Sequence, residues 1–506
     1  MIRLRQQLRI GAGFLPYLKY YLTPESAFDQ LRRRVENREQ RFLDVTKALI
    51  YSNKNSPYHQ LLHNAGCSLE DLEKSVGTHG LERTLENLRD AGVYVTVDEF
   101  KSKIPIRRGK LTILSAPSDF DNTFLMGRSM NALTSGSTAR ATRVMYDWNF
   151  FAEEAANELL LHAIHGVMEM PEAFWYPGFP SISGVHNLLV HLKFRKPPQK
   201  WYSHLKASMS SRSFMTALFL SCKLFGLTVP FPETTELQDA NRIAVWMSQK
   251  RPCCLKAFAS SAVRVVQSAK KNGLDISKSV IFAGGEQLTL NRKEFIESAG
   301  VRVYPRYVAT ETGLVAAACN EGTSDSMHLY TDRLAAIQKK DSDKILFTTL
   351  SCNTGKVLLN TELGDAGRIR SRPCTCLFGK AGMNTFFEEI QNQDKLTIEG
   401  MTVLGSTMDA IVSKLVAEHG GGPDDYQFWE SESENGVVKI LIAVSPDIPN
   451  LNESTFCNEV LSRLRSEGVA TNIASEVWKQ AESLQLIRSQ PKVSPGFKHF
   501  SFIKKS

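Results

Sequence analysis

Hydroxyl-bearing residues crowd around one glycine in the segment Asn131–Val144, which reads NALTSGSTARATRV. Small residues let backbone N–H groups approach an anion, hydroxyls donate further hydrogen bonds, and arginines neutralise phosphate charge. The segment therefore predicts a phosphate-binding loop, with a solvated turn as the alternative, and its spacing is not that of a Walker loop. The loop residues are Thr134, Ser135, Gly136, Ser137 and Thr138, with Arg140 and Arg143 behind them.

The elements that would hold this loop alternate between strands and helices. Short β-branched runs such as VIFAGG and VRVYPRYV are interspersed with the helical stretches Phe150–His165 and Asn241–Lys250. This alternation predicts an α/β architecture. The first hundred residues predict helices, one of them capped by Ser68, followed by a strand over Val93–Phe100, which reads VYVTVDEF.

A change of pattern near Lys395 predicts two domains. Beyond it the chain predicts helices over Ser406–His419 and Ser454–Ser466, a strand over Gly436–Pro446 and a final strand. We therefore expect an α/β body over residues 1–394, with β-sheets and packed helices, and a small α+β domain over residues 395–506.

Composition excludes several classes of protein. The 506 residues are 42% hydrophobic, which rules out wholesale disorder, and a formal charge of +8 is too weak a bias to indicate nucleic acid. Nine cysteines are too sparse for a disulfide scaffold, so we expect a reducing, cytoplasmic location.

Membrane association is expected to be weak at most. The apolar stretch Ser213–Pro232 is interrupted by Lys223 and Pro230, so it predicts a buried core or a substrate wall and not a transmembrane segment. The basic, amphipathic N-terminus leaves a weak peripheral membrane contact open.

The TSGST run resembles the signature of the adenylate-forming superfamily, which contains acyl-CoA ligases, luciferases and adenylation domains. Ala139 takes the place of the usual glycine. Three further segments resemble the superfamily's motifs and follow in the same order along the chain. They are Ile281–Leu288 (IFAGGEQL), Tyr304–Cys319 (YPRYVATETGLVAAAC) and Leu358–Ile369 (LLNTELGDAGRI).

The resemblance implies a role for each motif residue in binding ATP. The adenine would be held by the strand and turn that carry Gly284, Gly285 and Glu286, and Tyr307 would pack on it. Thr310 would touch the phosphate, Glu311 would bind Mg²⁺, and Asp365 would accept both ribose hydroxyls. Taken singly, these motifs also fit a tight Gly-Gly turn, a helix start capped by Thr310 and an acidic turn, and Val308 replaces the usual glycine.

The segment Lys47–Gly66 resembles the opening of the phenylacetate–CoA ligase branch, which includes acyl-protein synthetases. That branch often carries a structural zinc. Three thiolates and one imidazole can form a tetrahedral site, whereas unliganded buried thiols and a surface histidine are the alternative. The matching residues here are Cys319, His328, Cys374 and Cys376.

The resemblance also implies that the C-terminal domain moves between two half-reactions and delivers a lysine to the first. Lys498 resembles that lysine, with Lys492 as a rival and a solvated basic tail as the alternative. Asp394 would be the hinge, but Gln391 stands where the branch has a ribose-binding arginine. This change would weaken ATP binding, be covered by Arg368, or mark a chain that has left ATP chemistry.

The resemblance implies an ATP- and Mg²⁺-dependent ligase that converts a carboxylic acid to an acyl-adenylate and passes the acyl group to coenzyme A. A carrier protein, an amine or a protein cysteine are alternative acceptors, and a degenerate, non-catalytic homologue is a further alternative. The substrate wall is expected in Phe174–Leu188 and Ala257–Val263, where aromatic residues favour an aryl or fatty acid unless they belong to the core.

Overall fold

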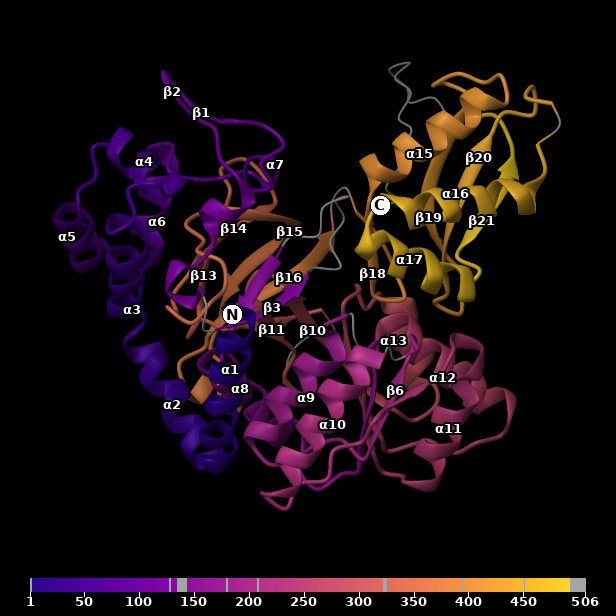
Figure 1. Ribbon diagram of the computed structural model, residues 1–506, viewed down its shortest axis with the longest axis horizontal. Coiled ribbons are helices and arrows are strands. Elements are labelled where there is room, and N and C mark those ends of the chain that lie inside the picture. The colour runs from indigo at the N-terminus through magenta and orange to yellow at the C-terminus, as the bar shows by residue number, and fades with distance from the viewer. Residues whose placement is uncertain are drawn as a thin grey trace.

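The computed structural model describes residues 2–126, 129–133, 143–178, 181–206, 209–321, 325–392, 395–449 and 451–491. It has the predicted α/β architecture, a large body followed by a small C-terminal unit (Figure 1). The body is built on a 12-stranded sheet with the strand order β13-β14-β15-β16-β12-β11-β10-β9-β8-β5-β6-β7.

One half of this sheet is parallel. Its central strands β8 and β9 are buried at every position, as expected for strands covered on both faces. All neighbouring pairs from β10 to β7 run in the same direction, so their carboxyl ends meet at one edge. The strands are β5 (Glu172–Trp175), β6 (Lys200–Ser203), β7 (Pro232–Thr234), β8 (Cys254–Phe258), β9 (Val280–Gly284) and β10 (Arg302–Ala309).

The other half of the sheet is antiparallel. It starts where β10 turns back into β11, and a bulge between Tyr307 and Val308 shifts the register of that pair. Its strands are β11 (Gly313–Ala317), β12 (Met327–Leu329), β13 (Leu334–Gln338), β14 (Lys344–Thr349), β15 (Thr361–Ser371) and β16 (Thr385–Asn392).

Helices cover the parallel half and bury its faces in one large apolar core. The predicted helix Phe150–His165 is confirmed as α8, which Asp147 caps at its N-terminus and Gly166 ends in the left-handed conformation. The predicted helix Asn241–Lys250 is confirmed as α11, shifted by one residue. These helices are α8 (Trp148–His165), α9 (Ser183–Lys193), α10 (Met209–Lys223), α11 (Ala240–Gln249), α12 (Ala259–Lys271) and α13 (Leu290–Glu297).

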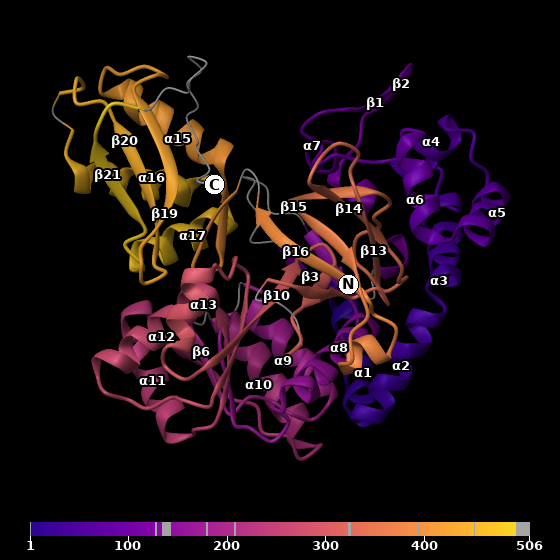
Figure 2. The same ribbon diagram turned by 180° about the vertical axis from the view of Figure 1, so that it is seen from behind.

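The N-terminal helices α3 to α6 lie along the antiparallel half, where a second apolar core forms, whereas α1 and α2 pack against α8 in the first core (Figure 2). The capping role predicted for Ser68 is confirmed, because its hydroxyl accepts from the Asp71 N–H. The helices are α1 (Ile2–Lys19), α2 (Pro24–Glu36), α3 (Arg38–Val45), a π-helix (Thr46–Tyr51), α4 (Pro57–Asn64), α5 (Leu69–His79) and α6 (Leu81–Asp90).

The strand predicted over Val93–Phe100 is wrong. Val95 forms a single bridge to Thr361, and the chain then enters the short helix α7 (Val97–Phe100). Thr96 and Glu99 form a capping box there. Their side chains accept hydrogen bonds from backbone N–H groups that would otherwise pair with a neighbouring strand. Two small hairpins follow: β1 (Ile106–Arg108) with β2 (Leu111–Ile113), and β3 (Met130–Leu133) with β4 (Arg143–Tyr146).

The C-terminal unit is α+β, as predicted, and begins when the chain has left β16. Its three-stranded sheet has the order β19-β20-β21 and is packed by helices. The unit lies next to α13, where the Arg292 Nε donates to the Gly436 carbonyl at 3.0 Å. Its elements are β17 (Lys395–Ile398), β18 (Met401–Leu404), α15 (Gly405–Glu418), β19 (Tyr426–Glu432), β20 (Val438–Val444), α16 (Glu453–Glu467), α17 (Val469–Gln480) and β21 (Leu484–Arg488).

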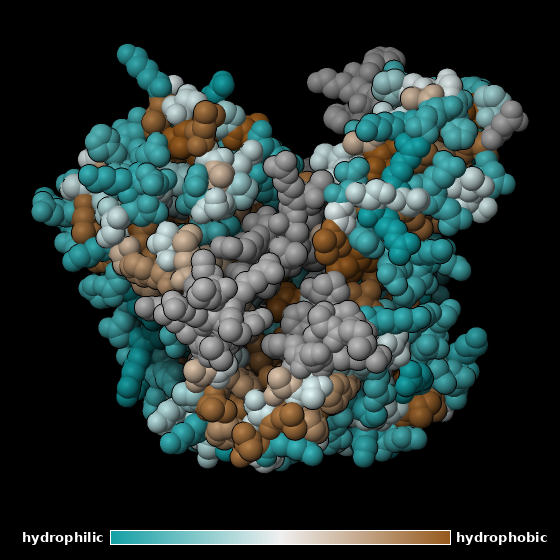
Figure 3. Space-filling view, in the orientation of Figure 1, coloured by the Kyte–Doolittle hydropathy of each residue, from teal (hydrophilic) through white to brown (hydrophobic). Residues whose placement is uncertain are grey.

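The segment Ser213–Pro232, predicted as buried core or substrate wall, is a half-buried surface helix and loop. Met215 and Leu218 pack inward, whereas Leu220 and Leu224 are 58% and 79% exposed. Apolar side chains gather at the lower edge of the body in Figure 3, where α10 lies in Figure 1. Among the described residues, every helix is too short or too polar to cross a membrane.

Candidate active site

A pocket of about 310 Å³ opens at the carboxyl ends of the parallel strands. Gly284 ends β9, Phe258 ends β8 and Tyr176 follows β5, and all three line it. Open α/β sheets bind ligands at this edge, because the loops that leave the strands converge there. Residues from β15 and from the hairpin β17–β18 complete the wall, so the body and the C-terminal unit both contribute to the pocket.

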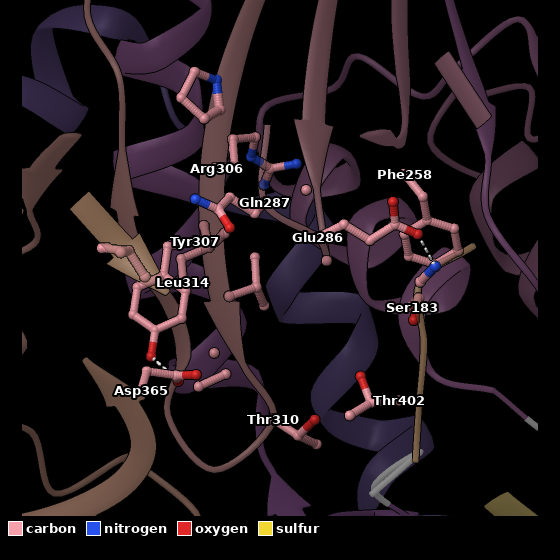
Figure 4. A pocket seen from close by; sticks show the side chains of 18 of the residues that line it. Ser183, Phe258, Glu286, Gln287, Arg306, Tyr307, Thr310, Leu314, Asp365 and Thr402 are labelled. Atoms are coloured by element: carbon pink, nitrogen blue, oxygen red, sulfur yellow. Dashed lines mark hydrogen bonds between the residues drawn. The ribbon is translucent and has the colours of Figure 1, made fainter. Parts of the chain in front are cut away.

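Tyr307 and Asp365 meet on one wall of the pocket (Figure 4). The Tyr307 hydroxyl donates a hydrogen bond to Asp365 Oδ2, and Lys395 Nζ lies 3.4 Å from Asp365 Oδ1. Burial, and then the Asp365 charge, raise the pKa of Tyr307, so its hydroxyl stays protonated as a donor. The two predicted nucleotide residues, 58 positions apart in sequence, therefore form one polar unit.

Thr310 and Glu311 form the turn between β10 and β11, and both line the pocket. This geometry excludes the alternative in which Thr310 caps a helix. The Tyr146 hydroxyl donates to the Thr310 carbonyl at 2.6 Å. Tyr146 ends β4, and Arg143, whose side chain is not described, begins it. The predicted loop residues Thr134, Ser135, Gly136, Ser137 and Thr138 lie outside the described residues, but the strands on either side of them pair at Leu133 and Arg143.

Gly284, Gly285 and Glu286 all line the pocket, but the Glu286 carboxylate is bound within the protein. It accepts hydrogen bonds from the Ser260 N–H at 3.0 Å and from the Gly400 N–H, and it pairs with Arg292 at 3.0 Å. Burial raises its pKa, and neighbouring Glu399 adds to the effect. Glu286 therefore fastens the C-terminal unit to the body, a contact that the motif did not reveal.

Gln391 stands where the branch has its hinge arginine, and a lysine that sequence reasoning missed, Lys395, lies beside the predicted ribose-binding residue Asp365. Gln391 is exposed on β16, and Arg368 pairs with Glu389 at 3.0 Å with 58% of its side chain exposed. Neither lines the pocket, whereas Lys395 does and lies beside Asp365. Asp394, the predicted hinge, lies outside the described residues, as do Lys498 and Lys492.

Lys101 is a second pocket residue that sequence reasoning missed. It follows α7 directly, and burial, then the charge of Lys395, lower its pKa to about 8. Sequence reasoning missed Lys101 because it expected a strand over Val93–Phe100. The structure has the helix α7 at the end of this segment, and this helix brings Lys101 to the pocket.

The four predicted zinc ligands lie together, with His328 on β12 and the three cysteines in the segments after β11 and β15. Their ligand atoms all lie within 4.8 Å of one another. Cys319 Sγ is 3.8 Å from Cys374 Sγ, and Cys376 Sγ is 3.3 Å from His328 Nε2. The Met383 carbonyl lies 2.7 Å from His328 Nδ1, and a carbonyl only accepts. Nδ1 therefore carries the proton and Nε2 offers its lone pair to the cluster.

No protein-family model and no curated protein sequence matches the chain. Its structure is similar to the crystal structure of 2-hydroxyisobutyryl-CoA ligase in complex with 2-HIB-AMP and CoA. The two chains are 14% identical, with 93% of this chain and 90% of that chain covered and a TM-score of 0.56. Amide bond synthetase McbA from Marinactinospora thermotolerans is 11% identical over 93% and 92% of the two chains, with a TM-score of 0.43. The chain therefore has the fold of the adenylate-forming superfamily, as the order of its motifs predicted.

Proposed function

We propose that this protein is an adenylate-forming ligase. In the first half-reaction a carboxylate oxygen of the acid attacks the α-phosphorus of ATP, which gives acyl-AMP and releases pyrophosphate. In the second, a thiol attacks the acyl carbon, which gives a thioester, AMP and a proton. Coenzyme A is the proposed thiol.

The observation that carries this proposal is the unit of Tyr307 and Asp365 beside the turn of Thr310 and Glu311 in one pocket. A carboxylate with two acceptor oxygens suits a vicinal diol, so Asp365 would bind the ribose. The Tyr307 ring would then lie against the base, and the turn of Thr310 and Glu311 would face the phosphates. The nucleotide would then lie along β10 at the carboxyl edge of the parallel strands.

Charge at the phosphates would come from several cations and one metal ion. Glu311 would hold Mg²⁺ together with phosphate oxygens, and the ion would neutralise charge on the leaving pyrophosphate. Arg143 and residues 134–138 would bind the phosphates, while Lys395 and Lys101 lie nearby in the pocket. Lys498, or Lys492 as its rival, would be brought to the α-phosphate by rotation of the domain over residues 395–506.

Acid-dependent exchange between ATP and labelled pyrophosphate tests the first half-reaction. We expect exchange with at least one acid of a broad panel and a raised KM for ATP in Asp365→Ala, whereas the exposed Asp29→Ala serves as the matched control. Exchange that is absent with every acid would identify a non-catalytic nucleotide-binding homologue. Comparing Lys498→Ala with Lys492→Ala in the same assay assigns the lysine.

Once an acid is known, mass spectrometry of the products tests the acceptor. Acyl-CoA formation with release of AMP supports the proposed thiol. If the acyl group is instead transferred to an amine, a carrier protein or a cysteine of the protein itself, the proposed first half-reaction stands and the proposed transfer to coenzyme A is wrong.

We also propose that Cys319, His328, Cys374 and Cys376 hold one structural zinc ion. Two sulfurs at tetrahedral zinc bond lengths lie about 3.8 Å apart, and the Cys319–Cys374 separation is 3.8 Å. None of the four residues lines the pocket, so the ion would fasten β12 to the segments that follow β11 and β15 and would take no part in the reaction.

A further inference from the structure

A group of charged side chains is buried behind the α9 wall of the pocket, and the proposed reaction does not account for it. Glu158 of α8 accepts a hydrogen bond from Arg306 Nη2 at 2.6 Å and pairs with Lys256 of β8. Glu172 of β5 lies 3.4 Å from His191 Nε2. At least nine-tenths of each of these side chains is buried. Burying ions is costly, so a buried group of this size is expected to have a specific role.

A second metal site is not the explanation. Glu158, His162 and His191 lie close enough to hold an ion, but the Lys256 ammonium already lies between two of them. His191 Nδ1 donates to the Asn187 carbonyl at 2.7 Å, so its Nε2 accepts from Lys256 Nζ at 3.1 Å. The lysine thus occupies the place that a metal cation would take.

Arg306 is the member of this group that reaches the pocket. It lines the pocket from β10, one residue before Tyr307, and successive side chains of a strand point to opposite faces. Figure 4 shows Tyr307 pointing toward Asp365 and Arg306 pointing away from it. Arg306 contacts Glu158 of α8 and Asn187 of α9. Since the proposed nucleotide occupies the half of the pocket with Tyr307 and Asp365, the half with Arg306 is left for the acid.

The guanidinium of Arg306 has binding capacity to spare. It donates to Glu158 and lies beside the Tyr176 hydroxyl, the contact with Asn187 Oδ1 is long at 3.4 Å, and Nε has no partner among the described residues. Glu158 is shared between Arg306 and Lys256, and the charge of Glu172 acts on Lys256 as well, so the carboxylate of Glu158 is not reserved for Arg306 alone.

The wall around Arg306 is polar. Helix α9 presents Ser183, His186 and Asn187 to the pocket, at the spacing of one helical face. Of the aromatic residues that favoured an aryl or fatty acid, Phe174 and Trp175 are fully buried in the sheet and absent from the pocket lining, whereas Tyr176 and Phe258 line the pocket. His186 pairs with Glu154 and the Asn187 amide donates to the Ser183 carbonyl, so this face of α9 is polar but is largely partnered within the protein.

From this arrangement we infer that the acid activated here is a dicarboxylic acid, whose second carboxylate Arg306 binds. The inference rests on the proposed function, because it takes the nucleotide half of the pocket as assigned. Glu158 then acts as a positioning residue that holds the guanidinium toward the pocket, and a bidentate arginine–carboxylate pair would fix the orientation of the acid.

Matched acids test the inference. Malonate is compared with propionate, succinate with butyrate and adipate with hexanoate, in pyrophosphate exchange and in calorimetric binding with AMP present. We expect one dicarboxylate to exceed its monocarboxylate partner by about tenfold or more in kcat/KM and in affinity. Arg306→Gln should abolish this preference, and Arg306→Lys, which keeps a charge against Glu158, should retain part of it. Lys196→Gln, a control at the solvent edge of the same group, should leave the preference unchanged.

The two proposals fail in different ways. Preference for a monocarboxylate, or a preference that survives Arg306→Gln, overturns the inference and leaves the ligase intact. Absence of exchange with every acid overturns the ligase, and calorimetry then decides the inference alone: a dicarboxylate bound in an Arg306-dependent manner supports it, and equal or no binding within every pair overturns it.

Discussion

The Tyr307 hydroxyl donates its hydrogen bond to the Asp365 carboxylate, and this bond joins β10 to β15 across the pocket. Between these strands in the sheet lie β11, β12 and β16, so the contact is made across the surface of the sheet and not along its hydrogen-bond ladder. Since Tyr307 orients one carboxylate oxygen and Lys395 lies beside the other, the ribose-binding group is held before any nucleotide arrives.

Variants of this pair should have effects on ATP binding that are not additive. Asp365→Ala should raise the KM for ATP in pyrophosphate exchange by about tenfold or more, because both acceptor oxygens are lost. Tyr307→Phe should raise it less, about two- to fivefold, since Lys395 still lies beside the carboxylate. The double variant Tyr307→Phe/Asp365→Ala should resemble Asp365→Ala, since the two residues act through one bond. Additive losses would show that each residue contacts the nucleotide independently.

Zinc content should follow the cysteine cluster. Protein purified without added metal should contain about one zinc ion per chain, measured by elemental analysis, and Cys374→Ser/Cys376→Ser should contain none and unfold at lower urea concentration. Cys352→Ser is the matched control, because Cys352 is half-buried and lies outside the cluster. Zinc-free wild-type protein that is as stable as the loaded form would contradict the proposal.

The motif residues could be located from sequence because each motif is local. Tyr307, Thr310 and Glu311 lie within one strand and its turn, so their spacing alone determines that they meet. Lys395 and Lys101 could not be located in this way, because they enter the pocket from the C-terminal unit and from α7, and only tertiary packing brings them together.

Helix and strand predictions differed from the structure for local physical reasons. The alternating run Val93–Phe100 has the period of a strand, but the Thr96–Glu99 capping box stabilises a helical turn instead. The aromatic run at Phe174 and Trp175 reflects a strand buried on both faces, and this pattern cannot be distinguished from a pocket wall by composition.

Lys101 should make stability depend on pH. Burial lowers its pKa from 10.5 to about 8 in the folded protein, so between these values the unfolded chain binds more protons. Stability contributed by this group therefore rises with pH across that window. Lys101→Met should be more stable than the wild type by about 1 to 2 kcal/mol at pH 7, and the advantage should shrink as pH rises toward 10.5.

Urea denaturation at pH 7, 8.5 and 10 measures this difference between the variant and the wild type. Lys103→Met, which removes an exposed lysine paired with Asp98, is the matched control and should shift the midpoint little at any of these values. A difference for Lys101→Met that is constant from pH 7 to 10 would contradict the lowered pKa.

Gly400 should control how the C-terminal unit docks on the body. It has a φ of +70° and its N–H donates to Glu286, and a Cβ at this position would collide with the ring of Phe258, which lines the pocket. Gly400→Ala should therefore displace the unit and reduce exchange by about tenfold or more. The variant should also carry the backbone strain of about 1 to 2 kcal/mol that a non-glycine residue has at a left-handed φ.

Gly420→Ala is the matched control. It has the same positive φ, at +87°, but open space around its Cβ, so it shows the effect of backbone strain without the collision. Small-angle scattering should show a changed profile for Gly400→Ala alone; equal behaviour of the two variants would mean that strain, and not contact with Phe258, determines the outcome.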